Sequence, residues 1–171
     1  MQEAKPDSTV ARIPHPSPEK LTEPVISRLR AEQIDSAIEL FQVQLLEHQI
    51  ETQPEQLRRV IEKMVADERF GFILGAMADS GQLVGVAYGG AYLGLEHGGE
   101  SGWLEELYVL PAWRQHGLGT RLVNETIRLA RARGWRALDL EIDTDHQRVV
   151  TLYTRHHFQL LNRSRYCLKL D

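Results

Sequence analysis

A strand-like run that turns through two glycines into a helix-like run is the feature that most constrains this chain. Leu107-Tyr108-Val109-Leu110-Pro111 precedes Arg114-Gln115-His116-Gly117-Leu118-Gly119, and a helical pattern continues to Ala130. A turn of this kind directs unpaired backbone N–H groups and the positive end of a helix dipole at one point. Glycine at 117 and 119 lets a ligand approach the backbone. The pattern predicts an anion site, although the same glycines could serve only the turn.

Two common phosphate-binding motifs are absent from this region. A dinucleotide fingerprint needs a third glycine where Leu122 stands, and the chain contains no Gly-Lys-Ser/Thr sequence of a P-loop. What remains is a short loop of the size of one pyrophosphate.

The composition narrows the class of protein. With 171 residues, 42% of them hydrophobic and 26% charged, the chain is of ordinary size and composition for one globular domain. A net charge of −4 argues against a nucleic-acid partner, which needs a basic face. The single cysteine, Cys167, excludes an intrachain disulfide and favours a reducing compartment. Because no apolar run approaches the length of a membrane span, we expect no membrane partner and a cytoplasmic location.

Hydrophobic periodicity and turn residues predict the order of elements. Residues 1–22 are rich in proline and are expected to form a disordered extension, followed by one domain over residues 23–171. Strands are predicted at 25–29, 70–78, 83–92, 103–109, 137–142, 158–161 and 165–170. Helices are predicted from Ile34, from Pro54, from Leu118 to the residue before Gly134, and at 147–156. A flexible glycine-rich loop is predicted at 94–102.

This order predicts an α/β fold with a mixed sheet. A strand, a helix and a strand in succession form a crossover unit, so strands 103–109 and 137–142 are expected to be parallel neighbours. The other strands are expected to be antiparallel. The prediction is a central, mostly antiparallel sheet of six to seven strands with one parallel pair, flanked by about four helices.

The motif from Leu107 to Gly119 resembles the core motif of the GNAT superfamily of acetyl-CoA-dependent N-acetyltransferases, Arg/Gln-x-x-Gly-x-Gly/Ala after a strand ending in Val. Leu152-Tyr153 followed by Phe158 is similar to a second motif of that family. The resemblance implies that acetyl-CoA is the cofactor, with the pantetheine arm along the strand and the pyrophosphate on the turn. The cofactor-binding residues that it implies are Leu107, Tyr108, Val109, Arg114, Gln115, His116, Gly117, Leu118, Gly119, Thr120 and His146.

Two positions depart from the family pattern. His146 stands where the family usually has Asn, and His157 stands where it has the Gly before Phe158. These differences leave open a second interpretation, in which the chain is a non-catalytic module that binds acetyl-CoA.

Two glutamates and one tyrosine are the candidate catalytic residues. Strand alternation puts Glu105 on the face of Trp103 and Leu107, an apolar setting that raises the pKa of a carboxyl group. Leu104-Glu105-Glu106 also resembles a run in spermidine/spermine-type acetyltransferases, where the first acid is the proposed base. Glu106 is the alternative, because a bulge in the strand would exchange the faces. Tyr153 matches the family's general acid.

The predicted activity is direct transfer of an acetyl group to a primary amine, with a small amine or polyamine-like molecule as the substrate. A protein N-terminus or an antibiotic amine is the alternative acceptor. Asp143 and Asp145 would help to attract a polyammonium substrate if they line the site, but such carboxylates also suit a solvent face. The seven histidines show no metal-ligand spacing, so no metal is predicted. The resemblance also implies that the chain can form a homodimer.

Overall fold

The computed structural model describes residues 22–143, 146 and 149–170, so residues 1–21 of the expected extension lie outside the described part. The described residues form one five-stranded sheet in the order β1-β2-β3-β4-β5. Its strands are β1 (Val25–Arg28), β2 (Gly71–Met77), β3 (Leu83–Gly94), β4 (Gly99–Val109) and β5 (Leu138–Leu140). Neighbouring strands are antiparallel except β4 and β5, which are parallel as predicted.

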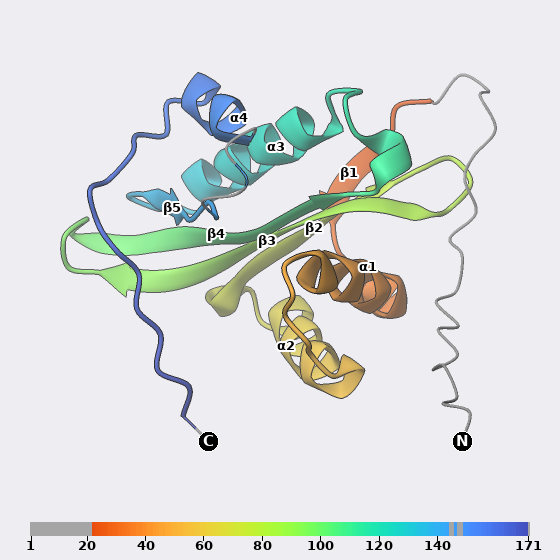
Figure 1. Cartoon of the computed structure of the whole chain (residues 1–171), viewed down its shortest axis with the longest axis horizontal. Coiled ribbons are helices and arrows are strands. Elements are labelled where there is room, and N and C mark those ends of the chain that lie inside the picture. Colours follow the sequence, from red (N-terminus) through yellow and green to blue (C-terminus); the bar gives the residue numbers. More distant parts are fainter. Residues whose placement is uncertain (1–21, 144–145, 147–148, 171) are drawn as a thin grey trace, which may run out of the picture.

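Helices cover both faces of this sheet (Figure 1). The helices α1 (Ile34–Glu47) and α2 (Pro54–Ala66) lie on one face, and α3 (Leu118–Ala132) and α4 (Val150–Arg155) lie on the other. The four predicted helices are therefore present, and α3 ends before Gly134, whose φ of 76° suits a glycine. Within the described residues, no helix combines the length and the apolar character needed to cross a membrane.

The predicted flexible loop at residues 94–102 is wrong, because most of this segment is strand. β3 runs to Gly94 and β4 starts at Gly99, so the two form a long hairpin with a short turn. Ser101 is fully buried, and the Glu100 carboxylate accepts hydrogen bonds from the Trp135 indole at 2.8 Å and from Arg133 at 3.2 Å. These long-range contacts hold a glycine-rich segment extended, and local composition carries no sign of them.

The predicted count of six to seven strands is also too high for the described residues. The expected strand pair at 158–161 and 165–170 has no strand hydrogen bonding, and its apolar side chains are exposed, Leu160 by 98% and Leu168 by 82%. Alternation of apolar and polar residues describes a strand with two different faces. It does not supply a neighbouring strand edge, which a sheet also requires.

The close approach of Trp135 to Gly102 fixes β4 where it meets β5. A Cβ atom on Gly102 would lie 2.0 Å from the Trp135 ring, and that ring stacks on Phe72 with 5.3 Å between centroids. Gly102 is paired with Leu138, so the same residue is part of the parallel pair.

We predict that Gly102→Ala lowers the free energy of unfolding by about 2–3 kcal/mol, because the buried indole must move to admit one methyl group. Urea unfolding followed by tryptophan fluorescence measures the loss. Gly90→Ala on β3 is the matched control, since its added Cβ would have only an ordinary contact, 3.8 Å from Tyr88. Equal stability of the two variants would contradict this packing.

Candidate active site

The site is built where β4 continues beyond β5. The two strands pair only from Gly102 to Leu104 on β4 and from Leu138 to Leu140 on β5. Residues 106–109 of β4 pair with β3, and residues 105–109 have no strand partner on the β5 side among the described residues. Alternate backbone groups of this free edge are therefore open to a ligand that adds to the sheet as a strand would. Leu107, Tyr108 and Val109, three of the predicted cofactor-binding residues, lie on this edge.

The predicted anion turn follows directly at the end of β4. A 3₁₀ turn at Pro111–Trp113 leads to Gln115 and Gly117, which have φ values of 65° and 80°, and α3 starts at Leu118. The first helical hydrogen bond runs from the Arg121 amide to the Gly117 carbonyl at 3.1 Å, and no side chain caps the helix. The amides of Leu118, Gly119 and Thr120 therefore have no partner among the described residues, at the positive end of the α3 dipole.

Backbone conformation explains only one of the two glycines. Gly117 needs to be glycine because of its positive φ. Gly119 is helical, and a Cβ there would meet only Leu152, at an ordinary 3.9 Å. A glycine in a helix costs stability, and nothing in the described fold requires this one. The free space above Gly119 is consistent with close approach of a ligand.

The Arg114 side chain is held by other protein groups. Its guanidinium donates to the Val109 carbonyl at 2.8 Å and to the Glu47 carboxylate at 3.1 and 3.2 Å. The Tyr108 hydroxyl donates to the same carboxylate at 2.8 Å. Burial raises the pKa of Tyr108 to about 12, and its hydrogen bond to Glu47 adds to that effect. Arg114 therefore ties the end of β4 to the end of α1.

A β-bulge determines which of the two candidate carboxylates is partly buried. Tyr88 pairs with Glu106 and Gly89 pairs with Leu104, which leaves Glu105 as the extra residue without a partner. Glu105 is exposed, whereas Glu106 is half-buried. Partial desolvation raises the pKa of Glu105, and the Arg165 guanidinium opposes that rise.

Glu106 faces α1 and has the more strongly perturbed carboxyl group. Its carboxylate accepts a hydrogen bond from the side-chain amide of Gln44, which is 4% exposed. Burial raises the pKa of Glu106 to about 7, and the negative charge of Glu105 contributes to the rise. His48 and Gln44 act in the opposite direction. A carboxyl group with a pKa near neutrality can accept and release a proton under physiological conditions.

Tyr153 brings a protonated hydroxyl to the same region from α4. Its ring is partly buried and packs edge-on against Phe158, with 5.7 Å between centroids. Burial raises the pKa of Tyr153 to about 12, and the charge of Glu106 raises it further. The phenol therefore keeps its proton at neutral pH and can act as a donor.

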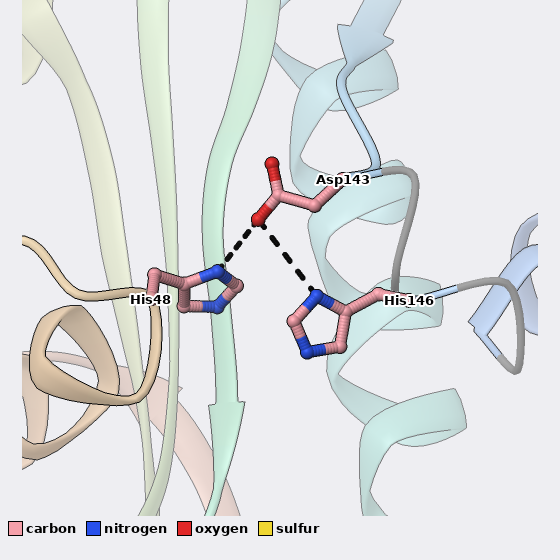
Figure 2. A group of neighbouring side chains, drawn as sticks. All are labelled: His48, Asp143 and His146. Atoms are coloured by element: carbon pink, nitrogen blue, oxygen red, sulfur yellow. Dashed lines mark hydrogen bonds and ion pairs between the residues drawn. The ribbon is translucent and has the colours of Figure 1, made fainter.

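His48, Asp143 and His146 form a cluster beside these groups (Figure 2). His48 caps the C-terminal end of α1, and Asp143 and His146 follow β5. The Nδ1 atom of His48 lies 2.7 Å from Asp143 Oδ2, and the Nδ1 atom of His146 lies 3.7 Å from it. The structure thus brings Asp143 toward the site, whereas Asp145 lies outside the described residues.

Sequence reasoning missed the residues that α1 contributes, which are Gln44, Glu47 and His48. One signal was available for Gln44. It falls seven residues after Ala37 and three after Phe41, on the apolar face of the helix, where a polar side chain needs a partner. Glu47 and His48 carry no comparable signal, because their partners come from β4 and from the segment after β5.

Comparison with known proteins identifies relatives of this arrangement. A sequence model described as the acetyltransferase (GNAT) family matches residues 34–158. A comparison with curated protein sequences found no match. The matched segment contains the free edge of β4, the glycine turn, Glu106 and Tyr153.

Several solved structures share the fold. An integron cassette protein from the mobile metagenome of Cole Harbour Salt Marsh has a TM-score of 0.75 at 19% identity, covering 85% of this chain and 90% of that chain. The aminoglycoside N-acetyltransferase AAC(6')-Iy in complex with CoA has a TM-score of 0.74 at 18% identity, covering 90% and 98%. A ribosomal-protein-alanine N-acetyltransferase from Brucella melitensis biovar Abortus 2308 has a TM-score of 0.70 at 19% identity, covering 87% and 100%. The predicted fold class is confirmed.

The buried carboxyl of Glu106 predicts a specific pH dependence of stability. Its pKa rises from 4.5 to about 7 on folding, so the protonated form stabilises the fold at low pH and this contribution is lost as the pH rises toward 7. Glu106→Gln should therefore raise the Tm relative to the unsubstituted protein at about pH 8, and the difference should vanish at about pH 4. Differential scanning calorimetry across this range measures it.

Glu100 on the same strand is a control of opposite sign. Hydrogen bonds from Trp135 and Arg133 lower the pKa of Glu100, so its stabilisation is present at neutral pH and lost in acid. Glu100→Gln should lower the Tm at about pH 8, with a smaller loss as the pH falls. A Glu106→Gln variant that is less stable at neutral pH would contradict the raised pKa.

Proposed function

Because the chain belongs to the GNAT family of acetyltransferases, we propose that it transfers an acetyl group from acetyl-CoA directly to a primary amine of a small, polyamine-like molecule. The observation that carries this proposal is the half-buried Glu106 on the free edge of β4, three residues before the strand ends and leads into the open amides of the turn. An anion-binding turn and a proton acceptor on one continuous segment suit a reaction that holds a phosphorylated donor and deprotonates an amine.

Acetyl-CoA fits the free edge and the turn in different ways. The pyrophosphate would accept hydrogen bonds from the amides of residues 117–120, where the α3 dipole favours negative charge. The pantetheine amides would pair with the backbone of Leu107 and Val109 on the edge that β5 leaves open. In this proposal Arg114 shapes the turn through Val109 and Glu47 and adds its charge at a distance.

Glu106 and Tyr153 supply the two proton transfers of the reaction. The neutral amine attacks the thioester carbonyl carbon, and the carbon–sulfur bond breaks. Glu106 takes the proton that the nitrogen loses, directly or through one water, and its pKa of about 7 suits that role. Tyr153 gives its hydroxyl proton to the departing thiolate. Glu106 is a better base than Glu105 because its carboxyl group is less solvated.

The charges around the site favour a cationic acceptor. The negative charges of Glu105 and Asp143 both raise the pKa of Glu106, and the basic group Arg165 lowers the pKa of Glu105. Negative potential of this kind attracts an ammonium group and raises its local concentration. Two of the structural relatives are named as acetyltransferases of an aminoglycoside and of a ribosomal-protein alanine. An antibiotic amine and a protein N-terminus are the alternatives to a polyamine.

We predict that Gly119→Ala separates ligand binding from stability. The substitution should raise the free energy of unfolding by about 0.5 kcal/mol, because alanine favours the helix and the added Cβ has room. The same methyl group should weaken acetyl-CoA binding by about tenfold, or 1.4 kcal/mol, in isothermal titration calorimetry. Arg131→Ala, an exposed position in the last turn of α3, should leave affinity unchanged. Unchanged affinity of Gly119→Ala would mean that the turn does not hold the pyrophosphate.

The choice between the two carboxylates is tested by activity. Glu106→Gln should lower kcat by about 100-fold or more while acetyl-CoA affinity stays the same, and Glu105→Gln should have a much smaller effect. Release of the CoA thiol, measured with polyamines, aminoglycosides, amino acids and peptide N-termini, provides the assay. The reverse order of the two variants would move the base to Glu105. Binding of acetyl-CoA without thiol release for any amine would favour a non-catalytic binding module.

A further inference from the structure

Three metal-ligating side chains meet at the end of α1, although they come from two segments far apart in the sequence (Figure 2). Each of His48, Asp143 and His146 offers one ligand atom, and these three atoms lie within 4.8 Å of one another. Figure 2 shows both imidazole rings turned toward the Asp143 carboxylate. The spacing of histidines along the chain could not reveal this group, because His48 is brought to the other two by tertiary structure alone.

One buried nitrogen of the cluster has no hydrogen-bond partner among the described residues. Asp143 Oδ2 pairs with His48 Nδ1 at 2.7 Å. His146 Nδ1 is buried and has no hydrogen-bond partner among the described residues, and its nearest charged atom is the same Oδ2 at 3.7 Å. The two imidazole rings lie 4.9 Å apart, centroid to centroid. A buried polar atom without a partner is costly, and a shared ligand would satisfy it.

We propose that His48, Asp143 and His146 bind one zinc ion. Two imidazole nitrogens and one carboxylate oxygen form a donor set that zinc accepts, with the fourth tetrahedral position open. Zinc-to-ligand bonds of about 2.0–2.1 Å in a tetrahedron put neighbouring ligand atoms about 3.4 Å apart. The observed separations of 2.7 and 3.7 Å from Asp143 Oδ2 lie on either side of that value. The separation between the two imidazole nitrogens is within 4.8 Å, so side-chain rotations that bring the two rings together around the ion would complete the site.

The zinc site lies beside the proposed base. Gln44, which donates to Glu106, precedes His48 by one turn of the same helix, and both His48 and Asp143 influence the Glu106 carboxyl. Zinc binding requires only the three ligands, so it can be measured without acetyl-CoA and without an acceptor amine.

A second histidine with acidic neighbours provides the matched control. His97 Nε2 lies 3.2 Å from Asp139 and 3.3 Å from Glu96, at the turn between β3 and β4. That group has one imidazole instead of two, and its Asp139 carboxylate already accepts a hydrogen bond from the Tyr92 hydroxyl. We expect it to bind zinc much more weakly than the proposed site.

Isothermal titration calorimetry of the full chain with zinc chloride, without acetyl-CoA, tests the proposal. The unsubstituted protein and His97→Ala should bind one zinc ion per chain with the same affinity. His48→Ala, Asp143→Asn and His146→Asn should each bind roughly tenfold more weakly or worse, since even groups that only support a ligand are worth about 10- to 100-fold. Magnesium chloride should give no binding, because magnesium prefers oxygen ligands.

Thermal unfolding of each variant without metal confirms that it is folded, so a loss of binding reports on the ligands. The proposal is overturned if the unsubstituted protein binds no zinc, if His48→Ala and His146→Asn bind as tightly as it does, or if His97→Ala removes the binding. It is equally overturned if magnesium binds with the affinity of zinc.

Discussion

Strands β4 and β5 stop pairing after Leu104 and Leu140, and the features of the candidate site follow from that short parallel contact. Had β5 continued, its hydrogen bonds would occupy the edge of β4 from Glu105 to Val109. The contact is held in place by Gly102, which has no side chain and so admits the Trp135 ring. Beyond it, β4 extends as a half-paired strand into the turn, and the unused amides of α3 lie at its end.

The bulge at Glu105 determines which carboxyl group on this free edge is partly buried. One extra residue opposite the Tyr88–Gly89 step leaves Glu105 in solvent and turns Glu106 toward α1, where it meets Gln44. Holding a carboxyl group in this setting costs stability at neutral pH, as its raised pKa implies. Such a cost is common at functional sites, where a group is kept in a setting that lowers the stability of the fold.

The parts of this protein that sequence predicts well are those with local causes. The glycine turn, the apolar face of α1 around Phe41 and the end of α3 at Gly134 depend on residues within a few positions of each other, and the helices are found as expected. The parallel pair also follows from the order of elements. The prediction for segment 94–102 was wrong because Trp135 and Arg133, which are distant in the sequence, hold it extended. The prediction of a strand pair within residues 158–170 was wrong because alternating apolar and polar residues do not supply a strand to pair with.

The candidate site was predicted in part for the same reason. The motif around Gly117 and Gly119 is contiguous, so its place at the start of α3 was accessible from sequence. The choice between Glu105 and Glu106 depends on a bulge, which the pairing with Tyr88 reveals. His157 has a φ of 66°, a left-handed conformation that glycine adopts most readily, and the resemblance implied a glycine at this position. The contacts between α1 and the segment after β5 join residues far apart in the sequence, so they could be found only from the folded structure.

The central claim is that the turn and the free edge of β4 hold acetyl-CoA with its thioester beside Glu106. A crystal structure of the protein with CoA tests it most directly. The account predicts pyrophosphate oxygens about 3 Å from the amides of residues 117–120, the pantetheine arm along Leu107 and Val109, and the sulfur near Tyr153. CoA bound elsewhere on the sheet, with the amides at the start of α3 free of phosphate, would contradict it.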